Sequence, residues 1–238
     1  MQPLSENERY RFECHGYLLL PEVLSPDEVA TVNAAADAHL EAYRHEYKER
    51  APATLQHASM LEGTEGFDPL IWHPNVLGRV NALLGNDAAF VETSVILKDG
   101  ETPAHTGWHR DIGPGGVDLT SATLAVSVIY YLSDVGPDGG AFAVVPGSHK
   151  FPFPVPKLEN IGDMPYYEVL AAPAGSAIFF HGALWHTATT NDSNRQRRTV
   201  HNYYFRRWMK KTVHTVIPER LYVQTEGDPV RARALFRP

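Results

Sequence analysis

The sequence predicts an α+β protein that is mainly β, in which helices come first and a sandwich or barrel of short strands follows. Helical signals are concentrated before Gly85, whereas short runs rich in β-branched and aromatic residues, separated by glycine and proline, follow it. No helical pattern between those runs is long enough for repeated βαβ units. A doubly wound parallel sheet is therefore not expected.

The first part of the chain predicts one short strand and two helices. The apolar stretch "HGYLLLP" (15–21) is typical of a strand. Ser25, Pro26 and Glu28 then supply the start signals of a helix, namely an N-cap, a favourable first position and a capping box. Apolar residues recur along this helix at three- and four-residue steps, at Val29, Val32, Ala36, Leu40, Tyr43 and Tyr47. A second helix is expected in "HPNVLGRVNALLG" (73–85), beginning at Pro74.

Six runs in the second part predict strands. They are "AAFVETSVILK" (88–98), "TLAVSVIYYL" (123–132), "AFAVVP" (141–146), "YYEVLA" (166–171), "SAIFF" (176–180) and "RTVHNYYFRR" (198–207). The connection Lys150–Pro165 is long and punctuated by proline. Connections of that kind inside a compact domain are usually functional, so we expect a loop or lid there.

Composition and charge exclude several classes of protein. The formal net charge is −7, so no basic surface for nucleic acid or anionic lipid is expected. No apolar run approaches the roughly 18 residues that a membrane span needs. The first residues are polar and lack an apolar signal segment, and Cys14 is the only cysteine, which rules out an intrachain disulfide. We therefore expect a cytoplasmic protein with no nucleic-acid or membrane partner.

The stretch "AHTGWHRDIGPGG" (104–116) places His109 and Asp111 two residues apart. If residues 108–112 are extended, both side chains project from one face, with Cα atoms about 7 Å apart, and can reach one ion. The glycine-rich residues that follow would leave the pair at the rim of a sheet. A lone His-x-Asp pair is more often two unrelated polar residues, and the kinase motifs that accompany "HRD" are missing.

Further polar residues downstream strengthen the interpretation as a metal site. His181 and His186 both follow an apolar strand, and either could join His109 and Asp111 in a triad of two histidines and one carboxylate. That ligand set suits non-haem iron(II), because it leaves coordination positions open. An arginine beyond them could hold the distal carboxylate of 2-oxoglutarate with two parallel hydrogen bonds, and the candidates are Arg195, Arg197 and Arg198.

Taken in order, several segments resemble the phytanoyl-CoA dioxygenase family of iron(II)- and 2-oxoglutarate-dependent oxygenases. They span roughly residues 12–207 and include "HGYLLLPEVLSPDEV", "WHPNVLGRVNALLG", "GWHRD", "GGAFAVVPGSHK" and "AGSAIFFHGALWHTATTN". The resemblance implies a double-stranded β-helix (a cupin-like jelly roll) with flanking N-terminal helices. It implies a single domain with a helical part at about 1–85, a jelly-roll core at about 86–208 and a C-terminal extension at 209–238.

The resemblance also implies roles for particular residues. By position, the iron ligands fall on His109, Asp111 and His186, since the family's third ligand stands five residues before an asparagine, here Asn191. The 2-oxoglutarate arginine falls on Arg197, eleven residues after that ligand. His181 stays as the alternative third ligand, and Arg195 and Arg198 stay as alternative anchors.

One position departs from the family. Many relatives have a threonine shortly before "PGSH" that helps to hold 2-oxoglutarate, and this chain has Phe142 there. Lys98, on the strand that leads to the His-x-Asp segment, is a candidate for the second anchor, and a solvent-facing lysine is the alternative.

The implied cofactor is iron(II), with 2-oxoglutarate and O2 as cosubstrates. The implied activity is hydroxylation of a C–H bond in a small or medium organic metabolite, with release of succinate and CO2. Desaturation, epimerisation or rearrangement on the same scaffold are alternatives, as are a non-catalytic metal-binding jelly-roll module and a zinc hydrolase. Halogenation is disfavoured, because halogenating relatives have a small residue where this chain has Asp111.

Overall fold

The structure is a computed structural model, which describes residues 2–51, 54–58, 60–104, 107–112, 122–209 and 216–235. Two sheets form its centre. One has seven strands in the order β1-β8-β5-β10-β4-β3-β2, and the other has three in the order β7-β6-β9. Every strand pair in both sheets is antiparallel. This arrangement confirms the mainly β architecture that the sequence predicts.

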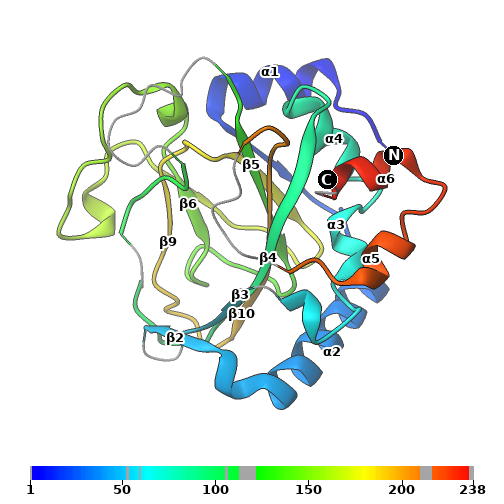
Figure 1. The fold of residues 1–238 in the computed structure, drawn as a ribbon. Helices are drawn as coiled ribbons and strands as arrows, with labels where there is room; N and C mark the ends of the chain where they lie inside the picture. Colours follow the sequence, from blue (N-terminus) through cyan, green and yellow to red (C-terminus); the bar gives the residue numbers. More distant parts are fainter. Residues whose placement is uncertain are drawn as a thin grey trace.

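The strands of the large sheet include the long central pair β4 and β10, which run side by side through the molecule (Figure 1). Its strands are β1 (Tyr17–Leu20), β2 (Lys48–Ala51), β3 (Thr54–Ala58), β4 (Ala88–Lys98), β5 (Ala125–Tyr131), β8 (Ala177–His181) and β10 (Arg197–Arg206). The small sheet consists of β6 (Phe142–Val144), β7 (Glu168–Leu170) and β9 (His186–Ala188).

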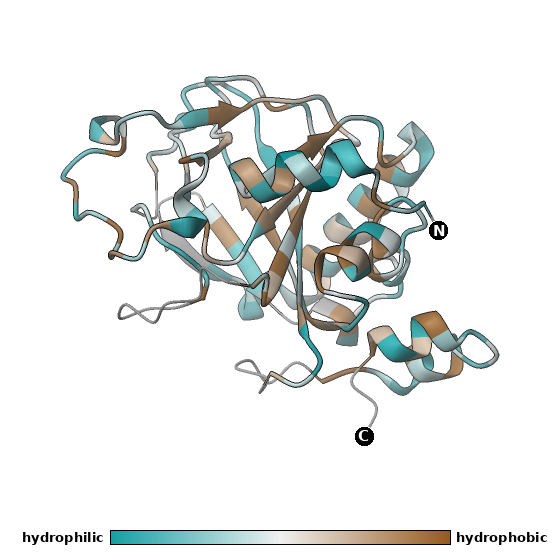
Figure 2. Ribbon diagram, turned by 90° about the horizontal axis from the view of Figure 1, so that it is seen from above, coloured by the Kyte–Doolittle hydropathy of each residue, from teal (hydrophilic) through white to brown (hydrophobic). Residues whose placement is uncertain are grey.

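Helices cover the face of the large sheet that points away from the small sheet (Figure 1). The α-helices are α1 (Glu6–His15), α2 (Pro26–Tyr43), α3 (Asp68–Ile71), α4 (Leu77–Leu83), α5 (Glu219–Val223) and α6 (Pro229–Ala234). Short 3-10 helices lie at Arg44–Glu46, Met60–Glu62, Ser148–Lys150 and Ile161–Asp163. The largest core cluster joins these helices to outward residues of the central strands, such as Val95 and Val200. Those strands are mainly hydrophobic (Figure 2).

Alternation along the strands directs different residues to the two faces of the large sheet. On β10, Val200 and Tyr204 pack in the helix-covered core, so Arg197, Thr199 and His201 point to the opposite face. On β5, Ile129 and Tyr131 likewise face the small sheet, where they pack with Phe142 and Phe180. The space between the two sheets is therefore the place where polar side chains of β10 gather.

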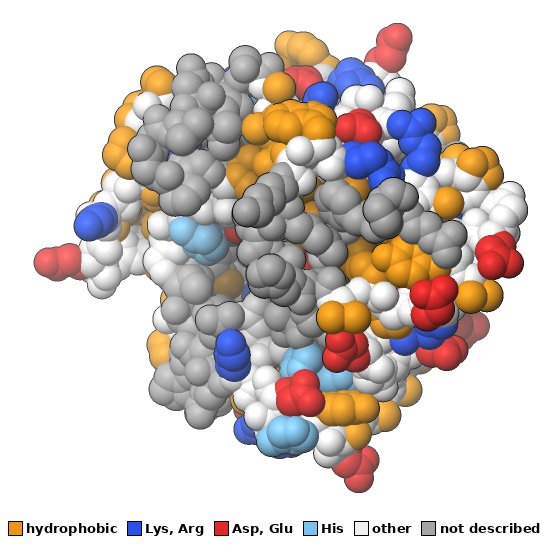
Figure 3. Space-filling model, in the orientation of Figure 1, with side chains coloured by type: hydrophobic (Ala, Val, Ile, Leu, Met, Phe, Trp, Pro, Cys, Tyr) orange, Lys and Arg blue, Asp and Glu red, His pale blue; other side chains and the backbone are white. Residues whose placement is uncertain are grey.

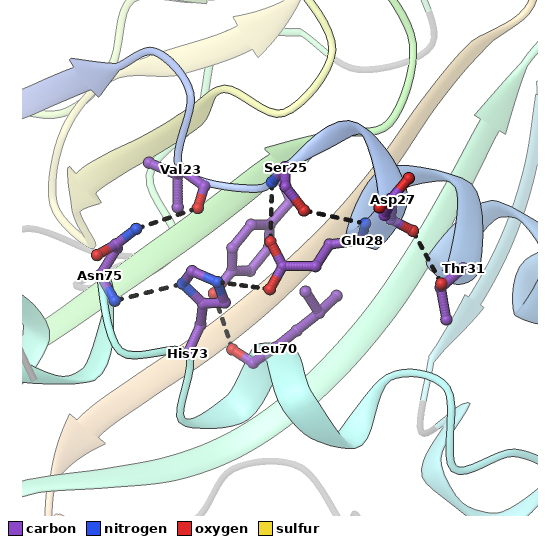
Figure 4. A network of polar contacts seen from close by, with 9 residues as sticks. Val23, Ser25, Asp27, Glu28, Thr31, Leu70, His73 and Asn75 are labelled. Carbon is purple, nitrogen blue, oxygen red and sulfur yellow. Dashed lines mark hydrogen bonds and ion pairs between the residues drawn. The ribbon is translucent and has the colours of Figure 1, made fainter.

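Helix α2 begins as the sequence predicts. Ser25 caps it through a complete capping box with Glu28, and Pro26 occupies its first turn. The Glu28 carboxylate also lies 3.2 Å from Nε2 of the buried His73, whose Nδ1 accepts a hydrogen bond from the Asn75 backbone N–H (Figure 4). The cap thus links α2 to the segment that leads into α4.

Several elements differ from the prediction. Helix α1, the β2–β3 pair and the short strand β9 were not expected. The second predicted helix begins at Leu77 rather than Pro74, because residues 73–76 form a turn whose carbonyl groups start the helix. Residues 108–112 do not form a continuous strand: only His109 makes a β-bridge, and the residues after it bend.

Within the described part of the chain, no helix is both long and apolar enough to cross a membrane. On the face of the molecule drawn in Figure 3, lysine and arginine side chains lie among aspartate and glutamate side chains over the helices.

Candidate metal centre and active site

His109 and His186 are brought together by a pair of backbone hydrogen bonds. Their N–H and C=O groups exchange bonds of 3.0 Å and 2.9 Å, which form an isolated antiparallel bridge. Residues directly opposite in such a bridge project to the same face, and the two rings lie with centroids 4.2 Å apart. Asp111 joins them, because its backbone N–H donates to the Gly182 carbonyl. Its Oδ1 lies 3.4 Å from His186 Nε2 and 4.0 Å from His109 Nε2.

The outer nitrogens of both rings are held by backbone carbonyl groups. His109 Nδ1 lies 2.9 Å from the Gly107 oxygen, and His186 Nδ1 lies 2.9 Å from the Leu184 oxygen. A carbonyl oxygen only accepts, so each Nδ1 carries the proton and each Nε2 presents its lone pair toward Asp111. This is the orientation that a carbonyl partner gives to a metal-binding histidine.

The charge states of Asp111 and His109 also suit a cation. Burial acts to raise the pKa of Asp111, but the neighbouring His186 and His109 and a hydrogen bond from the Ser127 hydroxyl outweigh it and lower the pKa. Burial, followed by the proximity of His186, lowers the pKa of His109. A carboxylate beside neutral imidazole is the protonation state in which these groups bind a metal.

The donor set fits iron(II). One ligand atom from each of His109, Asp111 and His186 can be chosen so that all three lie within 4.8 Å of one another. Two imidazole nitrogens and one carboxylate oxygen are the ligands of the non-haem iron triad, which leaves positions open for other molecules.

His181, the alternative third ligand, lies apart from this group. Its Nδ1 accepts a hydrogen bond of 3.0 Å from the Ala183 backbone N–H. Its ring contacts those of Phe12 and His149, at centroid distances of 6.3 Å and 5.0 Å. Burial lowers its pKa to about 3, so it is a neutral core residue.

Arg197 is buried beside the triad with much of its hydrogen-bonding capacity unused. Its side chain is 3% exposed, and Nη1 donates to the Gly140 carbonyl at 2.9 Å. Nε and Nη2 are buried without a partner among the described residues. Because an unpaired buried guanidinium is costly, these donors favour an anionic ligand such as a carboxylate.

Lys98 is the register neighbour of Arg197 on β4. The structure contradicts the solvent-facing alternative, because Lys98 is 0% exposed and its Nζ donates to the Thr189 carbonyl at 2.7 Å. Burial, followed by the charge of Arg197, lowers its pKa to about 8. Among the described residues, no carboxylate lies within 4.0 Å of either cation, and Asp192 raises the pKa of Lys98 only in part against burial.

The other two arginines face elsewhere. Arg198 points to the helix-covered face, where its Nη2 lies 2.6 Å from Asp37 Oδ1. Arg195 is exposed in the preceding turn. Of the three candidates, the structure brings only Arg197 to the His–Asp–His group.

A cavity of about 120 Å³ has these groups in its wall. His109, Asp111, His186 and Arg197 share it with apolar residues, of which Phe142 packs against the His186 ring at 5.1 Å. Phe142 therefore gives the cavity an apolar wall where relatives are expected to have a threonine hydroxyl. The remaining polar lining comes from Gln56, Thr187, His201 and Tyr203.

Sequence reasoning missed these four lining residues and Ser127. His201 and Tyr203 could have been found, because they continue the two-residue alternation that starts at Arg197 on β10. Gln56 carries no such signal, because strand β3 was not expected. Ser127 reaches Asp111 across 16 positions of sequence, so nothing local predicts the contact.

Comparison with known proteins decides the family. The model of the phytanoyl-CoA dioxygenase family matches residues 12–199. The chain belongs to the phytanoyl-CoA dioxygenase family. It is therefore an iron(II)- and 2-oxoglutarate-dependent dioxygenase, an oxidoreductase that uses O2, as the sequence predicts.

Curated proteins of similar sequence include a hydroxylase and a dioxygenase. L-proline trans-4-hydroxylase of Streptomyces griseoviridis is 26% identical over 93% of this chain and 93% of its own length. Ectoine dioxygenase of Streptomyces avermitilis is 26% identical over 62% of this chain and 52% of its own length.

Solved structures confirm the fold. HygX from Streptomyces hygroscopicus, with nickel and 2-oxoglutarate bound, has a TM-score of 0.75 at 17% identity, over 88% of this chain and 90% of that one. The epimerase SnoN, in complex with Fe3+, alpha ketoglutarate and nogalamycin RO, has a TM-score of 0.70 at 23% identity, over 87% of each chain. The predicted cupin-like jelly roll with flanking helices is thus confirmed.

Proposed function

We propose that this chain hydroxylates a C–H bond of a small polar metabolite, with His109, Asp111 and His186 as the iron ligands and Arg197 as the anchor of 2-oxoglutarate. One observation carries the assignment of residues. The three donor atoms and a buried guanidinium with two unpaired nitrogen atoms lie in the wall of one cavity. Neither a zinc hydrolase nor a metal-binding module without activity needs that guanidinium.

The chain's own residues would position the reactants. Arg197 would hold the distal carboxylate of 2-oxoglutarate through Nε and Nη2, the two atoms that lack partners. Lys98 would add a second positive charge in the adjacent register position, which supports its role as a second anchor. Gly140 leaves room for Lys98, since a Cβ there would lie 3.3 Å from the Lys98 side chain.

The bound metal with 2-oxoglutarate would supply the activation of O2, coupled to decarboxylation to succinate and CO2. Asp111 would offset part of the metal's charge, and the Ser127 hydroxyl would keep its second oxygen, Oδ2, hydrogen-bonded at 3.1 Å. Phe142 and Phe180 would exclude water from the wall beside His186, which protects a reactive centre from side reactions.

The cavity wall supports a small polar substrate. Gln56, His201 and Tyr203 offer amide, imidazole and hydroxyl groups on the side of the large sheet. The similar curated enzymes are named for L-proline and ectoine, which are small polar metabolites. We include a cytoplasmic location in the proposal, in keeping with Cys14 as a free thiol.

The test is a panel of small metabolites, including L-proline and ectoine, that is scored by succinate release with iron(II), 2-oxoglutarate and O2. Substrate-dependent succinate with a product heavier by one oxygen atom supports hydroxylation. A product lighter by two hydrogens, or one of unchanged mass, would replace hydroxylation with desaturation or epimerisation. Activity that survives replacement of iron by zinc would contradict the assigned chemistry.

A further inference from the structure

Residues 150–165, which the sequence predicts as a loop or lid, are packed behind the metal ligands. We call this segment the back strap. The structure describes all of it, and none of its residues lines the cavity that contains His109, Asp111 and His186. Phe151, Val155 and Ile161 instead pack on a separate apolar cluster that contains Trp108 and Trp185. In Figure 1 the back strap lies beyond β6 and β9, on the side away from the helices.

Two hydrogen bonds tie the back strap to the His-x-Asp segment. Trp108 Nε1 donates to the Ile161 carbonyl at 2.9 Å. Arg110 Nη2 donates to the Phe153 carbonyl at 2.8 Å. Trp108 directly precedes His109 in the chain, and Arg110 stands between His109 and Asp111. Both bonds therefore restrain the backbone that carries two of the three ligands.

Aromatic contacts tie the same segment to the third ligand. Trp185, which directly precedes His186, meets the rings of Phe151 and Phe153 edge-on at centroid distances of 5.2 Å and 5.5 Å. The Arg110 guanidinium lies 5.9 Å from the Trp185 ring centroid, within the range of a cation–π contact. Arg110 and Trp185 thus join the two ligand-bearing segments on the side away from the cavity.

The ligand segments need such a restraint. His109 belongs to a single β-bridge and Asp111 to a bend, so a regular hydrogen-bond ladder does not hold either side chain. A metal site works only when its ligands are held within about 0.5 Å of their productive positions. Trp108, Arg110 and Trp185 contact the back strap, whereas His109, Asp111 and His186 line the cavity, so the back strap can restrain the ligand segments without blocking the ligands.

We infer that the back strap is a brace for the metal centre and that Trp108, Arg110 and Trp185 are positioning residues for the three ligands. The inference rests on the proposed function, because it assumes that His109, Asp111 and His186 bind the metal. In this inference, residues 150–165 increase metal affinity and maintain the coordination geometry. They do not act as a lid over the substrate.

The test measures metal binding without turnover. Trp108→Phe keeps an aromatic ring but removes the N–H that reaches Ile161, and Arg110→Met keeps a long apolar side chain but removes the contacts to Phe153 and Trp185. We expect each variant to raise the nickel(II) dissociation constant of the metal-free protein about 10-fold in calorimetric titrations, as the loss of a group that orients metal ligands does. The visible absorption bands of the cobalt(II) protein should also shift.

The chain offers a matched control pair away from the site. Arg231 lies 5.5 Å from the ring centroid of Trp72, which is buried in the helix-side core. Trp72→Phe and Arg231→Met remove the same chemical groups, so we expect them to change thermal stability while the nickel dissociation constant and the cobalt spectrum stay at wild-type values. At the back strap itself, Arg110→Lys retains the charge, so it should bind nickel more tightly than Arg110→Met does.

If both Trp108→Phe and Arg110→Met bind nickel within twofold of the wild-type affinity, the inferred role of the back strap is wrong. An equal loss of affinity in the Trp72 and Arg231 controls would also overturn it, because general destabilisation would then explain the effect. His186→Ala separates this result from failure of the proposed function. If the wild-type protein binds nickel no better than His186→Ala does, the triad itself is wrong.

Discussion

At the scale of single residues, the direction in which a side chain points decides whether it reaches the site, more than its residue type does. Arg197 and Arg198 are neighbours of the same type, yet one lies in the cavity wall and the other pairs with Asp37 beneath the helices. The resemblance to the family already favoured Arg197 and His186, by position, over their alternatives. The structure adds the physical basis: burial with unpaired donors for Arg197, and a shared backbone bridge with His109 for His186.

The Arg197→Lys substitution tests the anchor. An ammonium group keeps the charge but cannot make two parallel hydrogen bonds to a carboxylate, so we expect the dissociation constant of 2-oxoglutarate to rise about 10- to 100-fold, as the loss of a charged hydrogen bond predicts. Calorimetric titration of the nickel-loaded protein measures this. Arg198→Lys is the matched control and should bind 2-oxoglutarate as wild type does. If the two variants bind 2-oxoglutarate with equal affinity, Arg197 is not its anchor.

At the scale of elements, the sequence predicts those whose pattern is local and strong. Helix α2, with its complete cap, and strands β4 and β10, with their long β-branched and aromatic runs, lie where they were expected. Helix α1 was missed because it buries only Phe12 and so has no apolar stripe. The β2–β3 pair and the three residues of β9 lack apolar alternation, and they become strands only because neighbouring strands pair with them.

Ser25→Ala tests the cap of α2. Loss of the N-cap hydroxyl should cost about 1 kcal/mol in the free energy of unfolding. For a chain of this length, that corresponds to a melting temperature lower by about 2–4 °C. Ser25→Thr, which keeps the hydroxyl, is the control and should melt near the wild type. An unchanged melting temperature for Ser25→Ala would show that the cap adds nothing to stability.

The same cap has a defined pH dependence. The backbone N–H of Ser25, followed by its hydroxyl and by His73, lowers the pKa of Glu28 against the opposing effect of burial. A carboxyl whose pKa is lower in the folded protein stabilises the fold above its unfolded pKa and loses that effect as the pH falls. The stability that the Glu28 carboxylate adds, measured as the difference in unfolding free energy between wild type and Glu28→Gln, should therefore shrink below about pH 4.5.

At the scale of the whole molecule, four of the histidines form two pairs with different surroundings. His109 and His186 face the cavity, whereas His149 and His181 pack against each other in the interior, at 5.0 Å between ring centroids. Burial, followed by nearby positive charge, lowers the pKa of His149 to about 4 and that of His181 to about 3. Composition shows only that histidine is abundant, since burial depends on packing between distant segments. The single-domain organisation at 1–238 stays a prediction.

The buried pair makes the stability of the molecule depend on pH. Below about pH 6.5 the unfolded chain protonates both imidazoles while the folded chain does not, so stability falls as the pH is lowered toward about 4. Between pH 6 and pH 5 each imidazole should contribute a loss of up to about 1.4 kcal/mol. Urea unfolding across this range measures it, and a His149→Gln, His181→Gln double variant should show a flatter profile. Equal slopes would contradict the assignment.

The most direct test of the central claim is an anaerobic titration with iron(II) and 2-oxoglutarate, followed by visible absorption. We expect the weak charge-transfer band of the iron–2-oxoglutarate chelate to appear in the wild-type protein and to be lost in Asp111→Ala, because the carboxylate that completes the triad is gone. A wild-type protein without the band, or an Asp111→Ala variant with the band at full strength, would contradict the account.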